Sequence, residues 1–209
     1  GPTWWLLATV ATYCIVGMAI TVGFHRLFSH LSFYTNNIYE FLLLVFGTMA
    51  CSGSSIQWNI AHQAHHKYSD GPGDPHNVKN IWSFLLFNYH YPKYDMKMVK
   101  MMLQRTHMPK LHLWMHHNFW LFNLSVLTVM FLIDPLFAFY GFVLPVGLLL
   151  IMGGIHNVVA HWGGRPRNIW WYAPISFGEW AHEEHHKFPS LPRFGDYDPG
   201  YKLIQFIRC

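Results

Sequence analysis

Two histidine triplets in this chain share a spacing that suits metal binding. They comprise, in chain order, His62, His65, His66, His182, His185 and His186. Residues at positions i, i+3 and i+4 of an α-helix lie on one face, so each triplet is expected to direct three imidazoles towards one point. Imidazole is a good ligand for iron, zinc, copper and nickel. We therefore expect all six side chains to bind metal.

An earlier pair of histidines, His25 and His30, is separated by five positions. Two residues at this spacing point about 140° apart on a straight α-helix. Either the helix ends between them, or the two residues serve different metal ions. Together with the triplets the pair makes eight histidines, which is too many for one ion, and two ions are the natural count.

Two further residues extend the expected site. His161 is a ninth candidate ligand, and Asn157 lies four residues earlier on the same helical face. An amide at this position could hold a metal-bound water while His161 binds the metal directly. His156 is turned about 100° away from Asn157 and is a weaker candidate. The site lacks thiolate ligands, which argues against a structural zinc site.

Acidic side chains should accompany such a site, because neutral imidazoles leave the charge of a metal uncancelled and need partners that fix their tautomers. The available carboxylates are those of Asp70, Asp74, Glu179, Glu183, Glu184, Asp196 and Asp198. Of these, Asp196 and Asp198 are expected to be solvated surface charges. The histidines that lack the triplet spacing are left out of the expected site; they are His76, His90, His107, His112, His116 and His117.

The composition is that of a membrane protein. The 209 residues are 52% hydrophobic and 11% charged, whereas soluble domains are roughly 25% charged. The alternative is a soluble enzyme rich in aromatic residues, and the long apolar runs argue against it. The three cysteines, Cys14, Cys51 and Cys209, are far apart and predict neither a disulfide framework nor a zinc–thiolate site.

The apolar runs predict an all-α integral membrane protein with a single domain over residues 1–209. Transmembrane helices are expected at about residues 4–22, 118–133 and 136–155, since each run approaches the length that crosses a bilayer. The run at about 38–52 is too short and interrupted, and is expected to form an interfacial helix. Residues 56–117 and 157–209 are expected to form a helical cap that holds a histidine-rich site for two metals.

This arrangement places all three histidine clusters on one side of the membrane. All 14 Lys and Arg residues fall on that side too, so the bias of basic residues towards the cytosol predicts a cytosolic site. The start of the chain would then lie on the opposite side. We therefore expect a fourth transmembrane helix upstream of this sequence, which would make the sequence truncated at its N-terminus.

The histidine motifs resemble the three histidine boxes of membrane fatty acyl desaturases. The sequences that carry the resemblance are TVGFHRLFSH, HHKYSDGPGDPHN and GEWAHEEHHKFP. The likeness is greatest to the stearoyl-CoA (delta-9) desaturase group. The segment Asn157-Val-Val-Ala-His161 of this chain resembles an additional Asn/His element of that group. The last box departs from the usual GEGxH pattern through Trp180 and through Glu183 and Glu184, and this departure bears on substrate fit.

The resemblance implies a di-iron centre of nine histidines, with Asn157 holding a water, and four transmembrane helices under a cytosolic cap. The implied ligands are His25, His30, His62, His65, His66, His161, His182, His185 and His186. The implied reaction uses O2 and two electrons to introduce a cis double bond, at the delta-9 position, into a saturated acyl chain. The implied partners are an acyl-CoA or acyl-lipid substrate, the lipid bilayer, and an external electron donor of the cytochrome b5 or ferredoxin type. The implied location is the endoplasmic reticulum in a eukaryote or the inner membrane in a bacterium.

Two rival functions fit some of the same features. A membrane di-iron fatty acid hydroxylase uses similar boxes and differs in its product. A metal transporter would place its histidines within the spans, whereas the histidines of this chain flank them. The basic cap favours a substrate that carries phosphate, but it also suits anionic lipid, so the sequence leaves the acyl carrier open.

Overall fold

A computed structural model describes residues 2–76 and 96–209, and these parts of the chain are helical. Within them, the only pairing between extended segments is an isolated antiparallel bridge between Thr35 and Arg208. The predicted all-α fold is therefore confirmed. The helices are α1 (Pro2–Met18), η1 (Ala19–Ser29), α2 (Asn37–Thr48), α3 (Ser55–Tyr68), α5 (Met96–Arg105), α6 (Pro109–His117), α7 (Phe119–Ile133), α8 (Pro135–Ala138), η3 (Phe139–Val143), α9 (Leu144–Ala160), η4 (Trp170–Ile175), α10 (His182–Lys187) and α11 (Pro199–Ile207).

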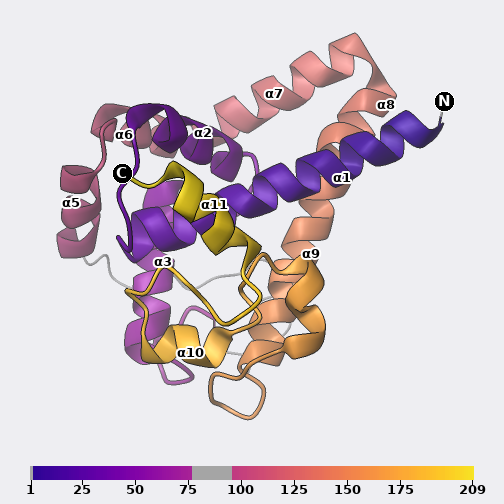
Figure 1. Ribbon diagram of the computed structural model, residues 1–209. Coiled ribbons are helices and arrows are strands. Elements are labelled where there is room, and N and C mark those ends of the chain that lie inside the picture. The colour runs from indigo at the N-terminus through magenta and orange to yellow at the C-terminus, as the bar shows by residue number, and fades with distance from the viewer. Residues whose placement is uncertain (1, 77–95) are drawn as a thin grey trace.

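Two continuous helices in the described parts are long and apolar enough to cross a membrane. Thr3–Ser29, formed by α1 and η1, has 27 residues, and Pro135–Ala160, formed by α8, η3 and α9, has 26. Both are longer than the runs expected from hydropathy, because each continues past its apolar part into the residues of the histidine site. The two helices pack against each other through α1 and α9, and Figure 1 shows α8 beside the N-terminal part of α1.

The third predicted span differs from a simple crossing. Helix α7 has 15 residues and bends by 79° away from α6, so it counts as a span only if the bent pair is taken as one. Asp134 ends α7 and caps α8 by accepting hydrogen bonds from the backbone N–H groups of Leu136 and Phe137. Helix α2 has 12 residues, fewer than a bilayer crossing needs, as expected for an interfacial helix.

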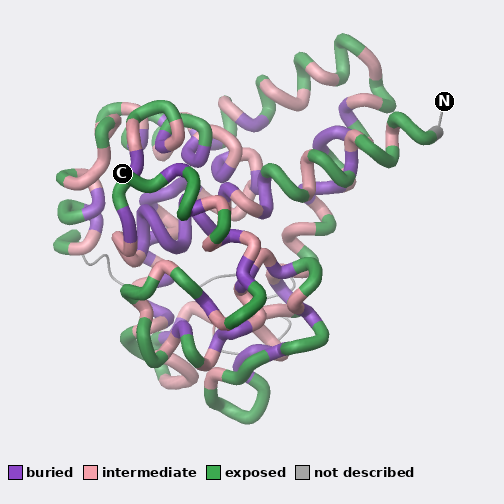
Figure 2. Tube along the Cα trace, viewed as in Figure 1, coloured by how far each residue is buried: buried purple, intermediate pink, exposed green. Residues whose placement is uncertain are grey.

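The outer faces of these apolar helices are exposed. Figure 2 shows many exposed residues along α7 and the N-terminal half of α1, whereas nearly all of η1 is buried. The exposed side chains include Trp4, Leu7, Leu121, Phe131 and Leu132. A soluble monomer rarely exposes large contiguous apolar patches, so these faces are suited to lipid.

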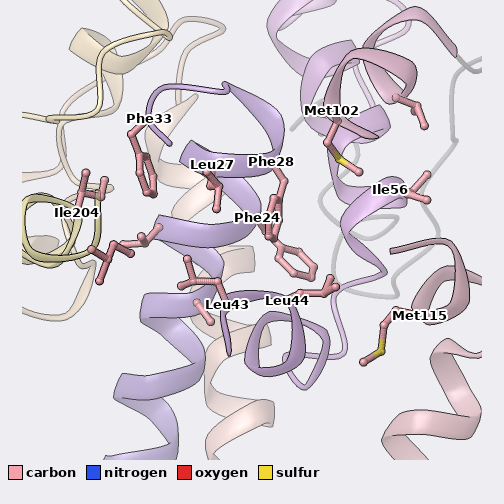
Figure 3. Close-up of a cluster of buried hydrophobic side chains, with 14 of the residues drawn as sticks. Phe24, Leu27, Phe28, Phe33, Leu43, Leu44, Ile56, Met102, Met115 and Ile204 are labelled. Atoms are coloured by element: carbon pink, nitrogen blue, oxygen red, sulfur yellow. The ribbon is translucent and has the colours of Figure 1, made fainter. Parts of the chain in front are cut away.

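The π-helical segment η1 lies at the centre of the packing, with α2, α3 and α11 against it. Figure 3 shows Phe24 and Phe28 extending from η1 towards the side on which Leu44 and Met102 lie, and all four side chains are fully buried. Helix α2 comes very close to η1, because a Cβ atom added at Gly47 would overlap the ring of Phe24. The core therefore fixes the segment that carries the first histidine pair.

Helix α3 is fixed at its start by a capping box. The Ser54 side chain accepts a hydrogen bond from the backbone N–H of Gln57, and the Gln57 side chain accepts one from the backbone N–H of Ser54. Two buried hydrogen bonds then tie α3 to η1, from Asn59 Nδ2 to the Phe28 carbonyl at 2.8 Å and from Gln63 Nε2 to the Ser29 carbonyl at 2.6 Å. These bonds set the face of α3 that meets η1.

The meeting of η1 and α3 predicts the result of a labelling experiment. Single cysteines at Tyr34, just after η1, and at Ser69, just after α3, should lie on the same side of the membrane. In a variant that lacks Cys14, Cys51 and Cys209, a membrane-impermeant thiol reagent should label both positions from one side. Labelling from opposite sides would refute a one-sided histidine site.

Candidate metal centre

Nine histidine side chains converge in two adjacent groups. Group 1 consists of His25, His30, His62, His66 and His185, and group 2 consists of His65, His161, His182 and His186. Within each group, the nitrogens that could bind a metal all lie within 4.8 Å of one another. The nine side chains are the same nine that the sequence analysis proposed as ligands.

Each triplet contributes to both groups, so the expectation that a triplet directs all its rings to one point is wrong. In α3, His62 and His66 belong to group 1 and His65 to group 2. The reason is helical geometry, because consecutive residues such as His65 and His66 point about 100° apart around an α-helix. In α10 the same division is reversed, since His185 joins group 1 while the other two histidines join group 2. The two groups touch where the rings of His66 and His186 stack, with centroids 4.3 Å apart.

The pair His25 and His30 lies in one group, in agreement with the first of the two alternatives, that the helix ends between them. The helix ends at Ser29, one residue before His30, but its last turns are π-helical. The backbone N–H of His30 donates to the carbonyl of His25 at 3.0 Å, a hydrogen bond that spans five residues. This wider turn returns His30 to the side of His25, and their ring centroids lie 5.0 Å apart. The two histidines therefore do not serve different ions.

The Nε2 atoms of the imidazoles face one another at short distances. These are 3.0 Å between His25 and His185, 2.6 Å between His30 and His62, and 2.7 Å between His161 and His182. In group 2 the Nε2 atoms of His65 and His186 are buried without a hydrogen-bond partner. A neutral imidazole has one donor and one acceptor nitrogen, so a crowd of Nε2 lone pairs is not satisfied by mutual hydrogen bonding. A metal ion in each group would accept these lone pairs, and the residues present fit that role.

Three carboxylates orient rings of the two groups from behind. Glu179 Oε2 lies 2.9 Å from Nδ1 of His25, and Asp74 Oδ1 lies 2.9 Å from Nδ1 of His65. Asp70 Oδ2 lies 3.1 Å from Nδ1 of His161. When Nδ1–H donates to a carboxylate, the lone pair is left on Nε2, which points into the group. The predicted acidic partners of the imidazoles are thus present at three positions.

The remaining acidic candidates do not contact the imidazoles. Glu183 pairs with Lys187 at 2.7 Å on the surface, and Glu184 is exposed. Asp196 is a surface charge, as expected, and lies 3.1 Å from Arg193. The expectation for Asp198 was wrong, since it is 4% exposed and binds Arg26. Sequence spacing could not pair these two residues, because Arg26 lies 172 positions away from Asp198 along the chain.

Burial keeps several of these imidazoles neutral, as His66 and His186 show. It lowers the pKa of His66 to about 2 and that of His186 to about 2, and neighbouring imidazoles lower both further. Burial alone would raise the pKa of Glu179, but the adjacent His25 and Arg26 outweigh it and hold the pKa at about 2. Near pH 7 His66 and His186 are therefore neutral and the Glu179 carboxyl is ionised, and these are the protonation states that favour binding of a metal cation.

The departures in the last box lie outside the two groups. The indole N–H of Trp180 donates to the carbonyl of Tyr197 at 2.7 Å. The added acidic residues Glu183 and Glu184 face the surface, as described above. The three histidines of the box lie in groups 1 and 2 despite these changes.

The histidines excluded by spacing lie outside both groups wherever the structure describes them. His112 and His116 form hydrogen bonds with Ser55 and Ser54, each at 2.8 Å. His156 comes near, with its ring centroid 4.9 Å from that of His182, but it belongs to neither group. His107 and His117 each form a hydrogen bond with a backbone carbonyl, and the ring of His76 lies beside that of His65. The prediction for His90 lies outside the described residues.

Asn157, the residue expected to hold a metal-bound water, lies on α9 one turn before His161.

Sequence reasoning overlooked two residues that surround group 1, Arg26 and Phe194. The ring of Phe194 lies 4.5 Å from that of His185 and 5.4 Å from that of His25, measured between centroids. The available signal was the charge of Arg26 at the end of a long apolar run, since an ionisable residue in such a helix usually has a dedicated partner. Phe194 carried no comparable signal in the sequence.

Comparison with known proteins identifies the class. The fatty acid desaturase family model matches residues 2–194, so the chain belongs to this family. It is 32% identical to a delta-9 acyl-lipid desaturase 2 of Arabidopsis thaliana, over 98% of this chain and 72% of the relative. It is 30% identical to an sn-1 stearoyl-lipid 9-desaturase of Anabaena variabilis, over 92% of this chain and 76% of the relative. It is 29% identical to acyl-CoA desaturase 1 of Saccharomyces cerevisiae, over 96% of this chain and 42% of the relative.

These findings make the chain a desaturase, an oxidoreductase that acts on fatty acyl groups. Its family and its long apolar helices make it a membrane protein. The resemblance recognised from the histidine boxes, including its delta-9 character, is confirmed by the same relatives.

The carboxylate behind His25 yields a prediction. In Glu179→Gln the neutral amide no longer fixes the His25 tautomer as firmly, and metal affinity should fall by about 10–100-fold. The measurement is metal content of the purified protein against a graded series of chelator concentrations. Glu183→Gln is the matched control, because it alters a carboxylate of the same box that faces the surface, and it should retain the wild-type affinity. Equal affinities in the two variants would refute the role of Glu179.

Proposed function

We propose that this protein is an O2-dependent delta-9 fatty acyl desaturase with two iron ions, one bound by group 1 and one by group 2. The observation that carries the proposal is the convergence of nine imidazoles, six of them buried and three partly buried, in two touching groups, with carboxylates behind three of the rings. The reaction removes two hydrogens from a saturated acyl chain. With O2, two electrons and two protons, it gives an unsaturated chain and two molecules of water.

Iron is the metal that best matches the reaction. An unactivated methylene offers no acidic proton and no electrophilic carbon, so side chains alone cannot attack it, and bound iron supplies the oxidising power. Nitrogen ligands without thiolates suit iron as well as zinc, but zinc has no redox chemistry. The family membership favours a redox metal for the same reason.

The chain itself contributes binding, orientation and the exclusion of water. The imidazoles of groups 1 and 2 hold the ions, and Glu179, Asp74 and Asp70 fix the rings that hold them. Most of the nine side chains are buried, which keeps bulk water away from the centre. We further propose that Asn157 acts through a metal-bound water, since it lies one helical turn before His161.

The substrate is a saturated acyl chain carried by a lipid or by coenzyme A, and the relatives include proteins named for each carrier. The electrons come from an external donor of the cytochrome b5 or ferredoxin type. We place the metal centre on the cytosolic side of the membrane, which is the endoplasmic reticulum in a eukaryote or the inner membrane in a bacterium. The excess of basic residues around the histidine boxes supports this orientation.

Hydroxylation is the alternative reaction, because a membrane di-iron hydroxylase uses similar histidine boxes. The two reactions are separated by their products, an unsaturated chain in one case and a hydroxylated chain in the other. The names of the relatives favour desaturation.

Expression in cells that lack their own delta-9 desaturase tests the proposal directly. The full-length gene should produce acyl chains with a cis double bond at position 9, mapped by mass spectrometry of separated lipid and acyl-CoA fractions. His65→Ala should abolish this product, because it removes a buried group 2 side chain, while His117→Ala, at an exposed position outside both groups, should retain it. A hydroxylated product, or full activity in His65→Ala, would overturn the proposal.

Asn157→Ala tests the water-mediated role. The variant should lose about 10–100-fold in activity, a loss typical of groups behind the ligands, yet keep two metal ions per chain in elemental analysis. Loss of one ion would instead indicate that the amide binds the metal directly.

A further inference from the structure

Arg26 is a fully buried charge that directly follows His25. Its Nη1 donates to both carboxylate oxygens of Asp198, each at 3.0 Å, and to the carbonyl of Pro192 at 3.1 Å. Its Nη2 donates to the carbonyl of Phe177 at 3.4 Å. The guanidinium of η1 thus binds the chain on both sides of α10, the helix that carries the last histidine box.

The same guanidinium lies on the face of an aromatic ring beside the metal centre. Arg26 Cζ is 3.9 Å from the centroid of Phe194, a cation–π distance. The Phe194 ring in turn contacts two imidazoles of group 1, those of His25 and His185. Asp198 also accepts a hydrogen bond from the backbone N–H of Phe194 at 2.7 Å. The pair formed by Arg26 and Asp198 therefore fixes both the backbone and the ring of Phe194.

A second connection leads from Arg26 to His25 through a carboxylate. Arg26 Nη2 lies 3.8 Å from Oε1 of Glu179, whose Oε2 meets Nδ1 of His25. Thr21, one π-helical turn before Arg26, donates a hydrogen bond to the same Oε1. The carboxylate that orients His25 is thus held between two residues of η1.

The surrounding backbone leaves room for this arrangement. Gly178 has a φ of +107°, and a Cβ atom there would lie 2.7 Å from Arg26 Nη2. A Cβ atom at Gly200 would lie 3.1 Å from Arg26 Nη1. Two glycines from separate segments therefore border the guanidinium, one of them in a conformation that side chains other than glycine rarely adopt.

We infer that Arg26 is a positioning residue of the metal centre, which acts through Asp198 and Phe194 to close the outer side of group 1. The aromatic ring shields His25 and His185, while Glu179 holds the His25 ring from behind. This inference rests on the proposed function, since it assigns group 1 a bound ion. It predicts that loosening Arg26 or Phe194 exposes one of the two ions and leaves the other protected.

The test is the rate at which EDTA removes metal from the purified, metal-loaded protein. In Arg26→Lys the charge remains but the forked contacts are lost, and in Phe194→Leu the apolar volume largely remains but the ring is lost. One of the two ions should leave about tenfold faster than in the wild type in either variant. Because both variants open the same cover, the double variant should release that ion no faster than the faster single variant.

Arg193→Gln is the matched control, because Arg193 precedes Phe194 but lies exposed in a surface pair with Asp196. It should release both ions at the wild-type rate. If Arg26→Lys does not fold, Phe194→Leu decides the question. A merely structural role would lower thermal stability while both ions leave at the wild-type rate, and that result in folded variants overturns the inference alone. A wild-type protein that binds fewer than two ions overturns the proposed function and the inference with it.

Discussion

Nine imidazoles that converge in two touching groups impose the condition that the rest of the structure meets. Protonated rings at these distances would repel one another, and Nε2 atoms of several rings face one another across short gaps. Metal cations between the rings would accept the lone pairs of these nitrogens. The carboxylates behind the rings, the burial of most of the rings, and the convergence of four chain segments all serve this condition.

The backbone brings the first two histidines together through a departure from regular α-helix. Eleven residues of η1 are π-helical, and this geometry brings His25 and His30 to one side while α2 and α3 pack against the same segment. π-Helical turns are rare and are often found at functional sites. In this protein the core around Phe24 and Phe28 stabilises the π-helix, so the hydrophobic packing and the metal centre depend on the same eleven residues.

The sequence predicted the membership of the site better than its geometry. Spacing and family resemblance identified all nine converging histidines, because ligand patterns on helices are local and specific. The division of each triplet between two groups was missed. Consecutive histidines point about 100° apart, but this difference assigns them to different groups only when a site lies on each side of the helix, which the sequence does not reveal. The π-helical turn was missed as well, since helix periodicity assumes 3.6 residues per turn. The buried partner of Asp198 was unpredictable because pairs remote in sequence leave no periodic signal. Two of the three expected spans coincide with helices long and apolar enough to cross a membrane, and both extend further than expected into the site, whereas the third, α7, is bent away from α6.

The shared helices have a consequence for how the centre is loaded. Helices α3 and α10 each carry side chains of both groups, so an ion that orders the helices for one group also arranges ligands for the other. The second ion would therefore meet helices that the first has already ordered, whereas the escape of each ion depends on its own cover, which for group 1 includes the ring of Phe194.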